Sequence, residues 1–197
     1  MEVMQSLSYP RDLMCALEAW ALEQRPVFIV GVPRSGTTRL SNIISSSPDF
    51  RRNRGEAVET NLVSSLPSFY KWKEPGPLLR YLGGKSGVDS IIDRGIKTLR
   101  DASADRKRKA FVQLYFFAMM HACKPKRIVE KTPLHIFSSD FLWCCFPKAL
   151  FVGCYRDPRA VYGSMRRRRQ VELDRGKKPD DWLNQSPGDF AKFYRDI

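Results

Sequence analysis

VFIVGVPRSGTT, residues 27–38, is the stretch of this sequence that decides the fold. Val27–Val30 is a short apolar run of mostly β-branched residues, which favours a strand buried on both faces. A turn bounded by Gly31 and Gly36 comes next, and residues 37–45 have the pattern of a helix. The two glycines have the G-x-x-x-x-G spacing of a phosphate-binding loop, in which successive N–H groups point at one anion and the helix start adds its positive end. The stretch therefore predicts an anion site between a strand and a helix.

The same loop departs from the pattern of nucleoside triphosphatases. A Walker loop carries Lys after its second glycine, whereas this chain has Thr37 there and Arg34 as the loop cation. A Mg²⁺-dependent enzyme also needs an acidic residue at the end of a neighbouring strand, and the best candidate strand, residues 150–155, runs into Arg156. This chemistry favours a phosphosulfate ligand over a magnesium-bound triphosphate.

The rest of the chain alternates strands with helices, which favours a parallel sheet. We expect an α/β fold, a P-loop-type three-layer domain with a central parallel sheet, and we expect one domain over residues 1–197. The predicted strands are 27–30, 127–130 and 150–155, and the predicted helices are 13–22, 37–45, 89–100, 105–123, 134–146, 157–170 and 190–197. Residues 46–55, 75–85 and 177–181 are polar or rich in Gly and Pro and are expected to be loops or breaks.

A second segment, FPKALFVGCYRDPRAVYGS at residues 146–164, repeats the strand-to-helix pattern. Arg156 stands at the carboxyl end of its strand, where open α/β sheets bind ligands, and its guanidinium fork suits a phosphate. Ser164 lies about two helical turns further on, so it projects from the next helix. Together the two segments resemble the sulfotransferases that depend on 3′-phosphoadenylyl sulfate (PAPS), and the P-R-S-G-T-T form resembles their bacterial-type and tyrosylprotein branches.

The resemblance implies a function and a set of binding residues. It implies metal-independent, in-line transfer of a sulfuryl group from PAPS to a hydroxyl or amine, leaving adenosine 3′,5′-bisphosphate (PAP). It places the 5′-phosphosulfate on Arg34, Ser35, Gly36, Thr37 and Thr38 and the 3′-phosphate on Arg156 and Ser164. Family members usually continue well past the second segment, so we expect this domain to be incomplete at its C-terminus.

The resemblance also implies catalytic groups. Lys131 lies in an E-K-T-P segment like the one whose Lys reaches the transferring sulfuryl group in the family, so Lys131 and Arg34 are the expected cations. Glu56 comes directly after Gly55, as does the proton-accepting Glu of the tyrosylprotein branch, and is the candidate base. Glu59 and His135 remain alternatives, because a base needs only to reach the acceptor proton directly or through one water.

Composition leaves two rival classes open. The formal charge is +13, with 34 Lys and Arg against 21 Asp and Glu, which favours anionic partners. A P-loop kinase or NTPase and a non-catalytic module that binds polyanions are both compatible with this charge. Arg156 and Asp157 could form a structural ion pair instead of a ligand site. The acceptor is not readable and could be an acidic peptide or a glycan; no nucleic-acid partner is expected.

Cysteine usage and hydropathy indicate a protein without a metal site or membrane span. The five cysteines show no C-x-x-C spacing, so neither zinc nor a disulfide framework is indicated, and the adjacent Cys144 and Cys145 are expected to be packed thiols. The longest near-apolar run, Phe111–Cys123, is too short to span a bilayer. We expect a cytoplasmic protein, or a Golgi-lumenal one if an anchor lies outside this sequence. The oligomeric state is open.

Overall fold

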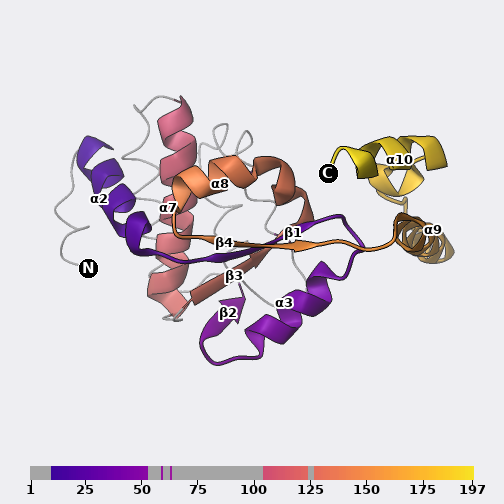
Figure 1. The fold of residues 1–197 in the computed structure, drawn as a ribbon, viewed down its shortest axis with the longest axis horizontal. Coiled ribbons are helices and arrows are strands. Elements are labelled where there is room, and N and C mark those ends of the chain that lie inside the picture. The colour runs from indigo at the N-terminus through magenta and orange to yellow at the C-terminus, as the bar shows by residue number, and fades with distance from the viewer. Residues whose placement is uncertain (1–9, 53–58, 60–62, 64–103, 124–126) are drawn as a thin grey trace.

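Four parallel strands form the centre of the molecule (Figure 1). The structure is a computed structural model that describes residues 10–52, 59, 63, 104–123 and 127–197. The strands are β1 (Val27–Gly31), β2 (Phe50–Arg52), β3 (Arg127–Lys131) and β4 (Leu150–Cys154), and their order in the sheet is β2-β3-β1-β4. The predicted α/β fold with a parallel sheet is confirmed.

The central strand β1 packs a different helix against each of its faces. Its alternate residues Val27 and Ile29 are buried with Leu40 and Ile44 of α3 (Thr37–Ser45). Phe28 and Val30 point the other way, into a larger apolar cluster. This alternation arises from the two-residue period of a strand, and it makes β1 apolar on both faces as its composition predicts.

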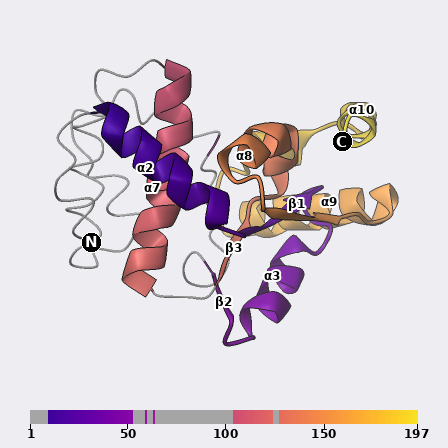
Figure 2. The same ribbon diagram turned by 60° about the vertical axis from the view of Figure 1, so that its left-hand side comes forward.

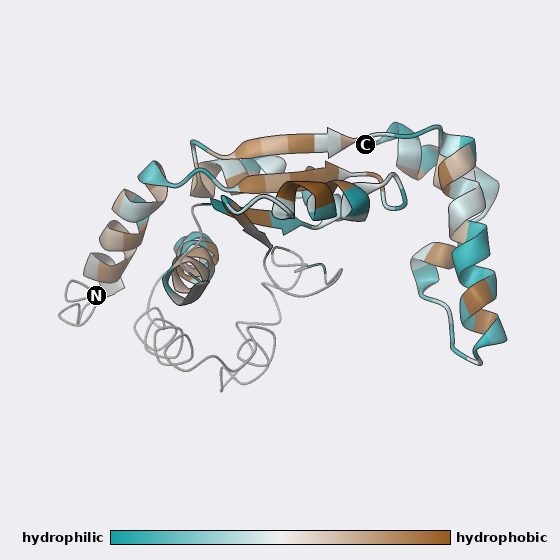
Figure 3. Cartoon of the chain, turned by 90° about the horizontal axis from the view of Figure 1, so that it is seen from below, coloured by the Kyte–Doolittle hydropathy of each residue, from teal (hydrophilic) through white to brown (hydrophobic). Residues whose placement is uncertain are grey.

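The larger cluster joins the sheet to three helices, namely α2 (Pro10–Glu23), α7 (Ala104–Cys123) and α8 (Ser139–Cys145), which lie on the face opposite α3 (Figure 2). The ring of Phe28 stacks on Phe151 at 5.2 Å and meets Phe116 edge-on at 5.6 Å. Apolar strands therefore lie between two helical layers of mixed polarity (Figure 3), as a three-layer domain requires.

The C-terminal helices form a unit at the end of the sheet where the strands finish. This unit contains α9 (Pro158–Asp174), a 3₁₀ turn (Asp181–Asn184, η2) and α10 (Pro187–Arg195). Asp157 caps α9 by accepting from the Arg159 amide, and Ser186 caps α10 by accepting from the Asp189 amide. Val32, which comes directly after β1, is fully buried among Val161, Met165, Leu183 and Phe190, so the phosphate-type loop and the C-terminal unit share one core.

Three sequence predictions need correction. Residues 50–52 form an edge strand rather than part of a turn, because β3 lies beside them and provides a ladder. The helix predicted over 134–146 begins as a 3₁₀ helix (Pro133–Ser138, η1), in which the His135 amide bonds to the Thr132 carbonyl. Cys144 is exposed, whereas Cys145 is buried and its pKa is raised to about 12 by desolvation. The loop predicted at 75–85 and the helix at 89–100 lie outside the described residues.

Two findings bear on the expected absences. No helix in the described ranges combines the length and the apolarity needed to cross a bilayer. Within the same ranges, no three His, Cys, Asp or Glu side chains gather as ligands for a metal would.

The turn out of β1 depends on a glycine. Gly31 has a φ of +129°, and a Cβ at this position would lie 2.3 Å from the carbonyl oxygen and 2.9 Å from the amide nitrogen of Cys154. Both atoms belong to the β4 backbone, so they cannot move aside without breaking the sheet. Gly31 therefore sets how closely β1 and β4 approach where the loop begins.

We predict that Gly31→Ala destabilises the protein by about 2 to 4 kcal/mol, because it combines backbone strain with a backbone clash. Gly163 in α9 is the matched control, since its added Cβ would meet no atom within 4 Å beyond its neighbours and the backbone of its own helix. Gly163→Ala should be neutral or slightly stabilising, because alanine favours helix. Urea unfolding followed by circular dichroism measures both; equal midpoints for the two variants would refute the role of Gly31.

Candidate functional site

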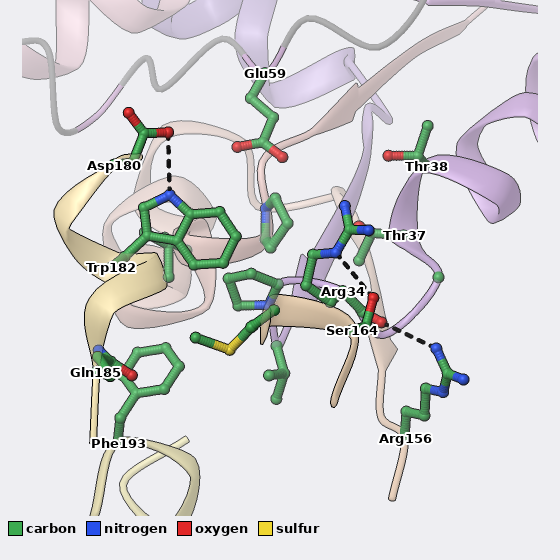
Figure 4. Close-up of a pocket in the computed structure, with 16 residues that line it drawn as sticks. Arg34, Thr37, Thr38, Glu59, Arg156, Ser164, Asp180, Trp182, Gln185 and Phe193 are labelled. Carbon is green, nitrogen blue, oxygen red and sulfur yellow. Dashed lines mark hydrogen bonds between the residues drawn. The ribbon is translucent and has the colours of Figure 1, made fainter. Parts of the chain in front are cut away.

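One cavity of about 470 Å³ lies beyond the carboxyl ends of β1 and β4 (Figure 4). Its wall comes from the loop after β1, the start of α3, the start of η1 and the C-terminal unit. The lining residues are Val32, Pro33, Arg34, Gly36, Thr37, Thr38, Glu59, Pro133, Leu134, Arg156, Ser164, Met165, Asp180, Trp182, Gln185 and Phe193. The volume lies within the range of about 300 to 1,000 Å³ that small-molecule sites occupy.

The loop after β1 curls around one side of this cavity. Gly36 is the N-cap of α3 with a φ of 106°, and Arg34 has a φ of 71°, which is unusual for a residue with a side chain. Gly36, Thr37 and Thr38 line the cavity at the start of α3, where free amides and the helix dipole favour an anion. Ser35 does not line it: its Oγ is buried and has no hydrogen-bond partner in the described part of the chain.

The two sequence segments meet at this cavity. Arg34 Nε donates to Ser164 Oγ at 3.2 Å, and Arg156 Nη1 donates to the Arg34 carbonyl at 3.4 Å. Asp157 bonds to Arg159 rather than to Arg156, with Arg159 Nη2 2.7 Å from Asp157 Oδ2. The hydrogen bond from Arg159 lowers the pKa of Asp157 to about 2. The alternative of an Arg156–Asp157 ion pair is therefore wrong, and Arg156 lines the cavity.

Lys131 ends strand β3 and is nearly buried, with 6% of its side chain exposed. Its Nζ lies 3.0 Å from Glu59 Oε1, and Glu59 lines the cavity with 39% of its side chain exposed. The ammonium group is therefore held next to the cavity through a carboxylate that faces it. A pair of opposite charges at this point can bind an anion and take up a proton.

Behind Lys131 lies a buried polar network. Glu130 is fully buried and accepts from Thr132 Oγ1 at 2.7 Å, and its Oε2 lies 3.0 Å from His135 Nδ1. His135 Nε2 accepts from the Val63 amide at 3.4 Å, so the ring proton lies on Nδ1 and is donated to Glu130. The network connects the end of β3, the start of η1 and Val63.

The structure brings most of the predicted residues together. Arg34, Gly36, Thr37, Thr38, Arg156 and Ser164 line one cavity, and Lys131 reaches it through Glu59. Glu56 lies outside the described residues, and His135 is buried away from the cavity wall.

Four further lining residues in the C-terminal unit, Asp180, Trp182, Gln185 and Phe193, have no counterpart among the sequence predictions. Residues 177–181 have only the composition of a polar break, and residues 182–193 contain no recognisable motif. Their place at the cavity depends on tertiary packing, so no local signal could have identified them.

The chain belongs to the sulfotransferase family, because the family profile Sulfotransfer_3 matches residues 26–195. Among curated proteins, the nodulation protein NoeE of Sinorhizobium fredii is 24% identical over 71% of this chain and 30% of its own length. Protein-tyrosine sulfotransferase 1 of Danio rerio is 27% identical over 71% of this chain and 34% of its own length. Protein-tyrosine sulfotransferase 2 of Gallus gallus is 28% identical over 74% of this chain and 35% of its own length. The chain thus spans about a third of the length of these relatives.

Solved structures give a looser similarity. The sulfotransferase STF1 of Mycobacterium tuberculosis is 18% identical, with a TM-score of 0.43 over 82% of this chain and 54% of that one. STF9 of Mycobacterium avium is also 18% identical, with a TM-score of 0.44 over 83% of this chain and 52% of that one.

We predict that His135→Ala lowers the free energy of unfolding by about 3 kcal/mol, because it opens a buried space and removes a donor from a buried carboxylate. His121, exposed in the last turn of α7, is the matched control, and His121→Ala should cost about 1 kcal/mol or less. Chemical denaturation of both variants tests this. Equal losses would show that the Glu130 network does not stabilise the fold.

Proposed function

We propose that this chain is the nucleotide-binding core of an enzyme that transfers a sulfuryl group from PAPS to an acceptor hydroxyl or amine. One observation carries the proposal: the glycine-bounded loop with Arg34 and the Arg156–Ser164 pair line the same cavity and touch each other. A ligand with two anionic groups on one nucleoside fits such an arrangement, because each group meets its own cation and hydroxyl donors.

In this proposal the 5′-phosphosulfate lies on the loop, where the amides and hydroxyls at Gly36, Thr37 and Thr38 and the Arg34 guanidinium provide donors. Arg156 and Ser164 hold the 3′-phosphate. Ser35 stays a candidate from the sequence; its buried hydroxyl has no partner in the described part of the chain, and the residue does not line the cavity.

The transfer itself is an in-line displacement at sulfur. A bond forms between the acceptor oxygen or nitrogen and the sulfur, while the bond from the sulfur to the bridging phosphate oxygen breaks and PAP leaves. Arg34 and Lys131 stabilise the negative charge that develops on the leaving oxygen, and a carboxylate accepts the acceptor's proton. The protein's own contribution is positioning and charge stabilisation, which requires no metal.

Glu59 is the carboxylate that the geometry favours for the proton, since it lines the cavity 3.0 Å from Lys131. Glu56 stays a candidate from the sequence. The position of His135 argues against it, because the residue is buried and both ring nitrogens are engaged by Glu130 and Val63.

Neither rival class explains the cavity as well. A P-loop kinase or NTPase places an acidic residue where β4 runs into Arg156. A polyanion-binding module would use the exposed arginines of α9, such as Arg166 and Arg167, and would not need the buried core that ties the loop to α9. Metal-independent PAP binding that ATP with Mg²⁺ competes poorly would exclude the first rival.

We predict that Arg156→Ala weakens PAP binding about tenfold to a hundredfold, the value of a charge-assisted hydrogen bond, while binding of adenosine 5′-phosphosulfate changes little because that ligand lacks the 3′-phosphate. Isothermal titration calorimetry in buffer containing EDTA measures both affinities. Arg167→Ala is the control, since Arg167 is exposed on α9 and does not line the cavity. Equal losses for the two ligands would contradict the assignment.

A second prediction separates the two glutamates. Glu59→Gln should reduce the rate of sulfuryl transfer about a hundredfold or more and leave PAP affinity within about threefold, because a general base acts on the acceptor proton and not on the nucleotide. Glu56→Gln, assayed in parallel by mass spectrometry of the sulfated product, should retain most of the rate. The reverse result would assign the base to Glu56.

A further inference from the structure

The cavity carries opposite charges on its two sides. Arg34 and Arg156 lie with Thr37, Thr38 and Ser164 on one side, and Asp180, Trp182, Gln185 and Phe193 lie on the other, with Glu59 between them (Figure 4). No Lys or Arg of the described chain lines that second side. We call Asp180, Trp182, Gln185 and Phe193 the aromatic compartment.

The aromatic compartment is a built surface rather than a loose loop end. Trp182 Nε1 lies 3.4 Å from Asp180 Oδ2, which fixes the indole beside the carboxylate. Phe193 is held by the ring of Phe137 at 6.1 Å, and the neighbouring Leu183 and Phe190 belong to the buried core around Val32. Trp182 remains 37% exposed and Leu134 remains 45% exposed, so apolar surface faces the cavity.

The expected position of the PAPS adenine leaves this compartment for the acceptor. The adenine and the 3′-phosphate of PAPS are carried by the same ribose, so the adenine stays near Arg156. Trp182 lies across Arg34 from Arg156 (Figure 4). Glu59, the favoured base, lies between Trp182 and the loop, where an acceptor proton must be released.

The groups in the compartment also define what the acceptor must offer. Asp180 accepts hydrogen bonds and repels anions, so an acidic acceptor is disfavoured on this side of the cavity. The negative face of the Trp182 ring attracts the weakly positive C–H groups on one face of a sugar ring. A simple phenol would use its one hydroxyl at the sulfur, whereas a sugar has further hydroxyls that can donate to Asp180 beside the Trp182 indole N–H.

We propose that the aromatic compartment binds the acceptor and that this acceptor is an uncharged sugar ring, stacked on Trp182 with a hydroxyl donated to Asp180. This inference rests on the proposed function, because the sulfuryl donor defines the other side of the cavity.

The test is a titration of the PAP-saturated full chain, followed by saturation-transfer NMR. The probes are the methyl glycosides of glucose, galactose, mannose and N-acetylglucosamine, the methyl glucuronide that differs from the glucoside by one carboxylate, and an acidic tyrosine peptide. The variants are Trp182→Ala and Asp180→Asn. Their controls are Trp143→Ala, exposed on α8, and Asp181→Asn, exposed beside Asp180; neither residue lines the cavity.

We expect at least one neutral glycoside to bind more tightly than the glucuronide and the peptide. Trp182→Ala should weaken it about threefold to tenfold, as an aromatic stacking contact predicts, without changing PAP affinity. The ratio of the glucoside's affinity to the glucuronide's affinity should fall by about threefold or more in Asp180→Asn, because this change removes the negative charge that repels the glucuronide. Both controls should behave as the unchanged protein does.

Three results would overturn the inference while PAP binding persists: no glycoside binds, the acidic peptide binds best, or Trp182→Ala weakens PAP as much as any glycoside, which would assign the indole to adenine. Failure of PAP to bind the unchanged protein would instead refute the proposed function itself.

Discussion

The close approach of Gly31 to the Cys154 backbone is the constraint on which the rest of the site depends. Because no side chain stands between the two strands, the chain can leave β1 directly beside the end of β4. That exit buries Val32 in the core of the C-terminal unit and puts the Arg34 carbonyl within reach of Arg156. The position of Arg34 next to Arg156 in the cavity is thus a consequence of backbone packing in the sheet.

The sequence predicts the elements whose signals are local. The apolar run of β1, the glycine-bounded loop and the helices with apolar residues at helical spacing can all be identified, because periodicity and turn chemistry act within a few residues. Strand β2 cannot be predicted from the sequence, because three residues form a strand only when a neighbouring strand, here β3, pairs with them. The start of η1 resembles an α-helix in sequence, and the hydrogen bond from the His135 amide to the Thr132 carbonyl, which makes this turn 3₁₀, is found only in the folded chain.

The same distinction holds for the cavity. Arg34, Thr37 and Thr38 can be identified because one loop holds them at fixed spacing, and Arg156 because it ends a recognisable strand. The ion pair of Lys131 with Glu59 joins residues 72 positions apart, and no sequence pattern around either residue predicts it. Trp182 faces the cavity only because the core around Val32 brings the C-terminal unit back over the loop.

Arg34 has an unfavourable backbone conformation and a favourable charge for the cavity. Its left-handed backbone, at a φ of 71°, suits asparagine or glycine better than arginine, while its guanidinium provides charge to the cavity. A population of variants selected only for thermal resistance should therefore lose this arginine early, and with it the affinity for anions. Arginine at this position therefore combines backbone strain with charge for the cavity, as expected where strain is concentrated at a working site.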